Sequence, residues 1–350
     1  MDTTKSLAKF RGTFRYYRSR LWQCGLTACV VLISVRITAA SQPDHPMWPL
    51  PPDKPKVEYL GEIFCEDLDL KSGFFGKLKR FIAGASEIEK ISLPFDVLVS
   101  GRTMFMTCQN IPYLISVDLD ELKYNVYTSD KLPFKYPIGL CGGKNGEIYI
   151  TDSENATVYR FSNGKVEPFI SDRLLRPTGI SANKSLQRLM VIDTGDHSLK
   201  LFDFDGNFIK MSGGKAGGDS GFNFPTFAAA NGKGGILVND ALNYRIKRFD
   251  WDGNFISAFG AEGDGPGAFS RPKGIAVDSE DHIYVVDNLF DNIQVFDDSG
   301  KLLLVIGSGG RKMGEFWSPS GIDIANDTIY IADTFNNRVQ ILRYLGKGTR

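Results

Sequence analysis

Hydrophobic residues between Pro272 and Gly307 form four short runs, and polar residues or glycine separate each run from the next. The runs cover residues 274–277, 283–286, 293–296 and 302–306. Runs of this length, bounded by Asp, Ser, Asn or Gly, predict four antiparallel strands joined by tight turns. A sheet of four short strands cannot bury both of its apolar faces by itself, so we expect further copies of the same unit in the chain.

The chain contains six copies of this unit, at steps of 40 to 48 residues between the prolines that open them. These prolines are Pro94, Pro137, Pro177, Pro225, Pro272 and Pro319. An aspartate closes the second run of every copy except the first, where Cys108 takes its place. The aspartates are Asp152, Asp193, Asp240, Asp287 and Asp333. A period of ~40–50 residues with four strands is typical of a β-propeller, in which each unit forms one blade around a central channel. The sequence therefore predicts an all-β fold, a six-bladed β-propeller over residues 56–350.

The sixth blade lacks one strand in its own sequence. It shows runs at 322–324, 329–332 and 339–344, but none follows them before the chain reaches Arg350. A lone apolar run at 57–63 precedes the first blade. Joining the two would close the ring and remove exposed sheet edges. We therefore predict that this N-terminal run pairs with 339–344 and completes the last blade.

The wording of the unit resembles the NHL repeat, and the resemblance covers residues 91–345. It rests on P-x-G-I-A-V-D in the first strand, I-Y-V-V-D in the second and I-Q-V-F-D in the third, as these stand in the fifth blade. Together with the opening segment WPLPPDKPKVEYLGEI, the chain is similar to exported bacterial propeller proteins of the cell envelope, among them lipoproteins. The resemblance implies an interaction scaffold whose partners are envelope proteins, electron-transfer components included.

The N-terminal segment has the features of an export signal. Residues 1–20 carry six Lys or Arg against one acid, and an apolar run follows at 24–35. Three forms remain open: cleavage after the small residues 38–40, an uncleaved membrane anchor over 21–40, or a lipoprotein with Cys29 as the lipidated residue of a lipobox-like LTAC string. All three place the rest of the chain outside the cytoplasm, in the periplasm or attached to the envelope. Residues 1–40 are thus predicted to be a signal peptide or N-terminal membrane anchor.

Two further segments precede the first blade. Residues 41–55 contain six prolines, which predicts an extended polyproline linker that is neither helix nor sheet. In residues 73–84, hydrophobic side chains at helical spacing stand opposite Lys and Arg. This pattern indicates a short amphipathic helix, packed on one end of the propeller or in contact with a membrane or partner.

The sequence offers little that resembles a catalytic or metal site. An aspartate at the end of a strand accepts hydrogen bonds from the amides of the following turn, which favours a structural role for the strand-closing aspartates over a cation site. His197 and His282 fall in turns on opposite ends of the propeller and cannot share an ion, and His45 lies in the linker. Outside the export segment, Cys65, Cys108 and Cys141 allow at most one internal disulfide, whose pairing the sequence leaves open. We predict no catalytic residue, no metal and no cofactor.

Charge and aromatic residues indicate a protein partner. The chain has 41 basic and 41 acidic residues, which argues against a nucleic-acid surface. One end of the propeller gathers the inter-blade connections and the turns after the strand-closing aspartates, and there charges of both signs are mixed with aromatic residues, the usual anchors of protein interfaces when they lie beside arginine. We predict that this end binds a partner, with candidate anchors Tyr244, Arg245, Phe290, Phe335 and Arg338.

The leading hypothesis is a non-enzymatic interaction scaffold in the bacterial envelope, built on a monomeric propeller that meets the membrane only through its N-terminal segment. The alternative is an extracellular hydrolase or lyase with a metal or polar site in the propeller channel.

Overall fold

The computed structural model describes residues 45–50, 53–68, 91–215 and 218–346 of the 350-residue chain. The predicted export segment (1–40) and amphipathic helix (73–84) lie outside these ranges. In the part of the chain that the structure does describe, no helix is long and apolar enough to cross a membrane.

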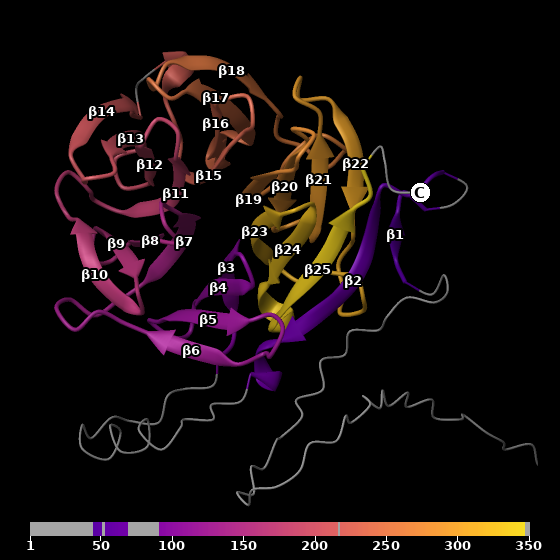
Figure 1. Cartoon of the computed structure of the whole chain (residues 1–350). Coiled ribbons are helices and arrows are strands. Elements are labelled where there is room, and N and C mark those ends of the chain that lie inside the picture. The colour runs from indigo at the N-terminus through magenta and orange to yellow at the C-terminus, as the bar shows by residue number, and fades with distance from the viewer. Residues whose placement is uncertain (1–44, 51–52, 69–90, 216–217, 347–350) are drawn as a thin grey trace, which may run out of the picture. The chain divides into compact units, whose positions relative to one another are not determined.

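Six antiparallel sheets stand around a central channel, which confirms the predicted six-bladed β-propeller (Figure 1). Blade one consists of β3 (Pro94–Ser100), β4 (Thr103–Cys108), β5 (Leu114–Asp118) and β6 (Tyr124–Tyr127). Blade two consists of β7 (Pro137–Gly142), β8 (Ile148–Asp152), β9 (Thr157–Ser162) and β10 (Lys165–Ile170). Blade three consists of β11 (Pro177–Asn183), β12 (Arg188–Asp193), β13 (Ser198–Asp203) and β14 (Phe208–Gly213). Blades four and five consist of β15 (Pro225–Ala230), β16 (Gly235–Asp240), β17 (Arg245–Asp250) and β18 (Phe255–Phe259); and β19 (Pro272–Val277), β20 (Ile283–Asp287), β21 (Asn292–Phe296) and β22 (Leu302–Ile306).

The proline that opens each blade has a fixed partner. It pairs with the last residue of the second strand, for example Pro272 with Asp287, and in the first blade with Cys108. The register shifts directly after the proline in all six blades. Because proline has no N–H to give to a ladder, it suits the first position of a strand. The two residues that mark the repeat in the sequence therefore meet at one end of every blade.

The N-terminal strand closes the ring, as the sequence predicted. Blade six contains β23 (Pro319–Ala325), β24 (Thr328–Asp333) and β25 (Arg338–Tyr344), and β2 (Val57–Phe64) pairs with β25 along its whole length. In Figure 1 these are the indigo and yellow strands that lie side by side. Burial of Val57, Tyr59 and Ile63 against the blade stabilises the closure by about 1.5–3 kcal/mol for each side chain.

The expected linker needs one correction. Residues 41–55 were expected to form no sheet, but β1 (Met47–Trp48) adds a fifth strand to blade six by pairing with β2. The prolines stand on either side of these two residues, at Pro46 and Pro49, and leave both of their N–H groups free for a ladder. The expectation failed because it treated a proline-rich segment as uniform.

Hydrophobic clusters fill the spaces between neighbouring blades. One of them joins Tyr149 and Val158 of blade two to Leu189 and Phe202 of blade three. Each blade thus buries one face against the blade before it and one against the blade after it, which is why a single unit could not be stable alone. This packing leaves two ends for function. We call the end with the inter-blade connections and the second-to-third-strand turns the connection end, and the opposite end the turn end.

Candidate docking site at the connection end

The strand-closing aspartates support the loops of the connection end. All five carboxylates are fully buried. Asp193 accepts hydrogen bonds from the amides of Leu175 and Arg176 in the preceding connection, at 2.7 and 2.8 Å, and from Gly195 in the following turn, at 3.0 Å. Asp287 does the same with Ser270, Arg271 and Leu289. The turn-capping role expected from the sequence is confirmed, and it extends to the connections as well.

A second set of buried polar side chains holds the connections from below, and the sequence analysis did not find it. These residues stand seven positions after the aspartate, in the third strand of blades three to six: Lys200, Lys247, Gln294 and Gln340. Each donates to a carbonyl of the connection, as Lys200 does to Arg173 at 2.6 Å and Gln294 to Ala268 at 2.7 Å. The signal was present, because a Lys or Gln stands at the same place in the third strand of four blades.

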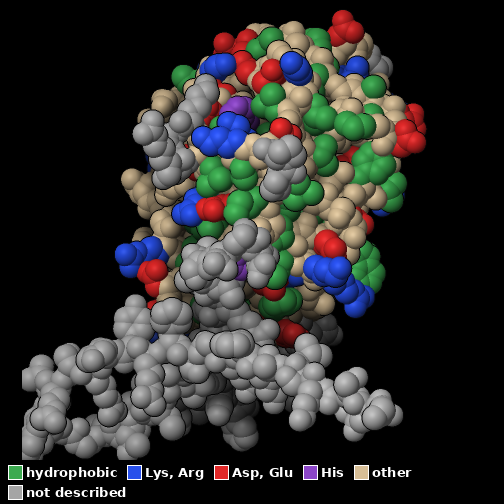
Figure 2. Space-filling view, turned by 90° about the vertical axis from the view of Figure 1, so that its right-hand side faces the viewer, with side chains coloured by type: hydrophobic (Ala, Val, Ile, Leu, Met, Phe, Trp, Pro, Cys, Tyr) green, Lys and Arg blue, Asp and Glu red, His purple; other side chains and the backbone are tan. Residues whose placement is uncertain are grey.

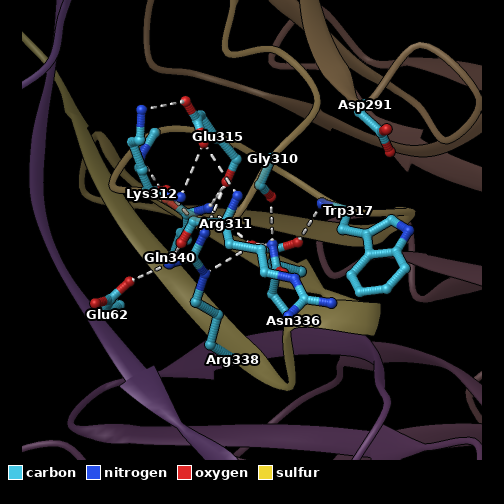
Figure 3. Close-up of polar contacts among 12 residues, drawn as sticks. Glu62, Asp291, Gly310, Arg311, Lys312, Glu315, Trp317, Asn336, Arg338 and Gln340 are labelled. Atoms are coloured by element: carbon cyan, nitrogen blue, oxygen red, sulfur yellow. Dashed lines mark hydrogen bonds and ion pairs between the residues drawn. The ribbon is translucent and has the colours of Figure 1, made fainter.

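In blade six this support includes Arg338, which the sequence proposed as a partner anchor. Its side chain is only 2% exposed and its Nε donates to Asp333 at 2.7 Å. The guanidinium also donates to Glu62 of β2 and to the carbonyls of Lys312 and Glu315, at 2.6, 3.0 and 2.7 Å (Figure 3). Burial and five intrachain hydrogen bonds leave no donor for a partner. Arg338 is therefore corrected from an anchor to a residue that holds the connection into blade six.

An exposed cluster of aromatic and basic residues lies above Arg338. Trp317 and Phe335 are 40% and 46% exposed, and their rings meet edge to face with centroids 5.7 Å apart. The Arg311 guanidinium lies over the indole, 4.5 Å from its centroid. The backbone beneath is fixed, because the Trp317 amide donates to buried Asp333 at 2.8 Å and the Phe335 amide donates to the Trp317 carbonyl at 3.0 Å. Figure 3 shows the indole directed away from the polar network.

Large apolar side chains continue from this cluster around the connection end. Fourteen large hydrophobic side chains are exposed in the described residues, and eight of them lie on this end. They are Leu132, Leu175, Phe224, Leu242, Leu289, Met313, Trp317 and Phe335. Leu242, Leu289 and Phe335 hold the same position, two residues after the aspartate, in blades four to six. At the turn end only Leu186 is of this kind in the described turns. Exposed apolar surface is thus concentrated on one end, on the side of blades four to six.

The other proposed anchors lie on the same end but differ in accessibility. Tyr244 is half-buried, adopts a left-handed backbone conformation at the end of a short helical turn, and packs against the core between blades four and five. Arg245 is 33% exposed and its Nε donates to Asp240 at 3.0 Å. Phe290 is half-buried beside the more exposed Leu289. Among the anchors proposed from the sequence, Phe335 has the most exposed apolar side chain. Trp317, Leu242 and Leu289 are further candidate anchors on the same end.

The channel forms a second candidate site. The first strands of all six blades line a cavity of about 240 Å³. Asp96 and Asp323, from the neighbouring blades one and six, contribute carboxyl groups that accept the amides of Leu140 and Val99 at 2.8 and 2.7 Å. Burial raises the pKa of Asp323 to about 6 and the pKa of Asp96 well above its ordinary value.

Towards the connection end the channel is narrowed by two aromatic rings. Phe95 of blade one and Phe227 of blade four meet with centroids 5.9 Å apart. Phe227 also lines the cavity, and most of the other lining residues lie further along the first strands, towards the turn end.

Comparison with protein families agrees with this architecture. A family described as a 6-bladed beta-propeller matches residues 230–293 and 279–345, and the NHL repeat matches residues 134–161. The chain is an NHL-type six-bladed β-propeller. Comparison with curated proteins found no match.

Solved structures similar to this NHL-type propeller have different functions. Virginiamycin B lyase from Staphylococcus aureus is 16% identical, with a TM-score of 0.54 over 72% of this chain and 95% of that chain. An auxiliary nutrient binding protein from Bacteroides thetaiotaomicron is 12% identical, with a TM-score of 0.60 over 73% and 69%. Hydrazine synthase from Kuenenia stuttgartiensis is 12% identical, with a TM-score of 0.53 over 74% and 98%. At such identities the likeness concerns the fold, which serves enzymes and binding proteins alike.

His197 and His282 have structural partners, and the cysteines of the propeller are buried. His197 lies at the connection end, where its Nδ1 accepts the Phe224 amide at 3.1 Å, and His282 lies at the turn end, so the two are separated as expected. No group of three or more His, Cys, Asp or Glu side chains suited to a metal occurs within the described residues. Cys65, Cys108 and Cys141 are buried, and burial raises the pKa of Cys108.

Proposed function

We propose that this propeller is a protein-binding scaffold of the bacterial cell envelope and that it docks its partner on the connection end, over blades four to six. The observation that carries the proposal is the exposed cluster of Trp317, Phe335 and Arg311 on a rigid base. Trp and Arg are the residue types that dominate binding energy in protein interfaces, and they do so where their backbone is already ordered.

The surroundings of the cluster support a protein partner. Leu289 and Leu242 extend the apolar surface over two further blades, and Lys312 and Glu315 border it with charges of both signs. A hydrophobic centre with a mixed polar rim is the usual anatomy of a protein interface. A surface for nucleic acid would need charge of one sign.

The proposed cellular location rests on the N-terminal sequence. Residues 1–40 combine a basic stretch with an apolar run, which supports a location in the periplasm or on the outer side of a membrane. The partner is accordingly an envelope protein, a class that includes electron-transfer proteins. An alkaline phosphatase fusion joined after Pro55 should be active in cells. An inactive fusion, in a strain that exports control fusions normally, would refute the proposed location.

Site-specific crosslinking tests the docking end. A photo-crosslinking amino acid is placed at Phe335 or Leu289 on the connection end, and at Leu186 on the turn end as the matched exposed control. We expect an envelope protein to be captured from the first two positions and not from the third. Capture from Leu186 alone would show that the partner binds elsewhere.

A further inference from the structure

The channel cavity carries acidic side chains without a basic residue in its wall. Asp96 and Asp323 line it, and among the described residues no Lys, Arg or His lines it with them. The outer surface of the propeller is different. Figure 2 looks onto the side that carries β1, β2 and β22 in Figure 1, and acidic and basic side chains lie close together there. A cation that enters the channel therefore meets charged side chains of one sign.

Both acids depart from the repeat. Asp96 is the second residue after the opening proline, where four of the other blades have glycine and blade four has Phe227. Asp323 is the fourth residue after the proline, where the other blades have alanine, serine, cysteine or leucine. Because blades form without a carboxyl group at these positions, the fold does not require either acid.

Neither carboxyl group has a cationic partner within the described ranges. Asp96 is only 6% exposed, and its two oxygens accept the amides of Val97 and Leu140, at 3.0 and 2.8 Å. Asp323 accepts the Val99 amide and is partly open to the cavity. A buried carboxylate without a countercharge is costly, and a bound cation would offset that cost. Each oxygen has two lone pairs, so the backbone amides leave room for a further donor.

A buried hydroxyl lines the cavity across the channel. Ser181 of blade three is the fourth residue after its opening proline, as Asp323 is in blade six, and it pairs with the second strand in the equivalent register. From this position Asp323 reaches an amide of the neighbouring first strand, so the position directs a side chain along the channel wall. Ser181 is 8% exposed, and its hydroxyl has no hydrogen-bond partner in the described part of the chain. This hydroxyl is available to a ligand.

The size and shape of the cavity restrict the ligand further. A volume of about 240 Å³ lies below the ~300–1,000 Å³ of typical small-molecule pockets, so the ligand is small. Ala228, Ala229 and Ala230 of blade four supply an apolar wall. Because the Phe95 and Phe227 rings narrow the channel towards the connection end, the ligand enters from the turn end.

The acceptors in the channel suit an ammonium group better than a metal ion. Ca²⁺ takes ~6–8 oxygen ligands, and the described residues contain no group of three or more His, Cys, Asp or Glu side chains placed to hold a metal. A primary ammonium group has three N–H donors and no acceptor, and carboxylate oxygens can accept its hydrogen bonds.

We propose that the channel binds a small primary ammonium compound with a second polar group, such as an amino alcohol. The ammonium group lies at Asp96 and Asp323, the hydroxyl contacts Ser181, and the short hydrocarbon part lies against the alanines of blade four. Coulomb attraction to the carboxylates selects the cationic end group. The site does not involve the docking surface at the connection end, so either proposal can fail without the other.

Three probes with one carbon chain test the preference for a cation. 4-Aminobutan-1-ol, butane-1,4-diol and 4-hydroxybutyrate share a hydroxyl and carry a cationic, a neutral and an anionic end group. In ligand-observed NMR titrations of the full-length protein at pH 7.5, we expect the amino alcohol to bind at one site, the diol at least about 10-fold more weakly, and the acid not measurably. Equal or tighter binding of the diol or the acid, no binding of the amino alcohol, or its displacement by an equal concentration of Ca²⁺ would overturn the proposal.

The ionisable neighbours of Asp323 leave a clear range of pH for a second test. Cys141 and Tyr330 stay neutral, because burial raises the pKa of both. Lys184 follows the last residue of β11 at the turn end and does not line the cavity. Lys273 lies against one of the two aromatic rings, and burial lowers its pKa to about 8. Below pH 8 the charge in the lining therefore changes through the two aspartates.

The affinity for the amino alcohol should rise with pH. Because burial raises the pKa of Asp323 to about 6, its carboxyl group is mostly protonated at pH 5 and mostly ionised at pH 7.5. The amine keeps its charge over this range. Binding of 4-aminobutan-1-ol should be about 10-fold weaker at pH 5 than at pH 7.5, and binding of butane-1,4-diol should not change. A pH-independent affinity for the amino alcohol would contradict the contact with Asp323.

Two aspartates provide a matched pair of variants. Asp323→Asn should weaken 4-aminobutan-1-ol at least about 10-fold and leave butane-1,4-diol unchanged, which also shows that the channel is intact. Asp118→Asn removes an exposed acid at the turn after β5 and should change neither. Ser181→Ala should weaken 4-aminobutan-1-ol about 2- to 10-fold and leave butylamine, which has no hydroxyl, unchanged. Equal effects of Asp323→Asn and Asp118→Asn, or an equal loss of both amines in Ser181→Ala, would contradict the placement of the ligand.

Discussion

At the two ends of the propeller, the polar backbone groups of the loops find their hydrogen-bond partners in different ways. At the turn end, several short turns carry their own side-chain acceptor, as when Asp203 accepts the amides of Asp205 and Asn207 at 2.9 and 2.8 Å. These bonds lower the pKa of Asp203. At the connection end, the loops are longer and buried side chains such as Asp333 and Arg338 satisfy them from below. The outer surface of these loops is therefore free to present Trp317 and Phe335 to a partner.

The closing strand spans both ends, and its removal should have the largest effect. Deletion of residues 1–64 removes β2, exposes β25 as a new edge, and takes Glu62 away from Arg338 and Glu58 away from Arg343. The ring should open, and thermal unfolding monitored by circular dichroism should lose its single cooperative transition. A deletion variant with the same transition as the protein that retains residues 41–64 would show that the strand is dispensable.

Two arginines of β25, one at each end, allow the two ends to be compared directly. Arg338→Ala at the connection end leaves the buried Asp333 carboxylate without its cationic partner and the Lys312 carbonyl without this donor, and should lower the free energy of unfolding by about 3–5 kcal/mol. Arg343→Ala at the turn end breaks an exposed pair with Glu58 and should cost about 0–1 kcal/mol. Urea unfolding of both variants measures the difference. Equal losses would mean that the buried network supports the loops no better than a surface ion pair does.

Substitution of Asp323 in the channel should change the free energy of unfolding by a smaller amount, which depends on pH. Its pKa is raised from 3.8 to about 6 in the folded state, so the folded protein binds this proton more tightly than the unfolded chain. This contribution to stability is full below pH ~4 and is lost as the pH rises to about 6. Asp323→Asn removes the cost of the buried charge, and at pH 7 should stabilise the protein by at most about 3 kcal/mol.

Urea unfolding at several pH values checks this prediction. The difference between Asp323→Asn and the unsubstituted protein should grow between pH 4 and pH 7. Asp118→Asn is a useful control at the turn end, because turn amides lower the pKa of Asp118 and its dependence on pH has the opposite sign. A pH-independent difference at Asp323 would exclude a raised pKa.

The parts of the molecule set by local patterns could be predicted from the sequence. The alternation of apolar residues and the regularly spaced Pro and Asp residues predicted the blades. The missing fourth strand of blade six predicted the pairing of β2 with β25. The exposure of Arg338 could not be predicted, because it depends on the connection at 307–318, which folds over the guanidinium. The spacing of residues along β25 contains no information about what covers them.

The exposed aromatic cluster was predicted in part for the same reason. Phe335 follows a strand-closing aspartate, so its position on the connection end was evident from the repeat. The contact between Trp317 and Phe335 joins two loops that the repeat marks only as neighbours, and the indole was not among the proposed anchors. The β1 strand likewise arises from packing between distant segments.

The central claim is that the connection end, rather than the turn end, carries the docking surface, and the affinity for the crosslinked partner tests it most directly. Trp317→Ala combined with Phe335→Ala should raise the dissociation constant at least about 30-fold, the effect expected of an interface hot spot, and should leave the unfolding midpoint nearly unchanged because both side chains are exposed. The control, Leu186→Ala combined with Met211→Ala, should leave affinity unchanged. An unchanged dissociation constant for the Trp317 and Phe335 variant, with a loss in the control, would contradict the claim.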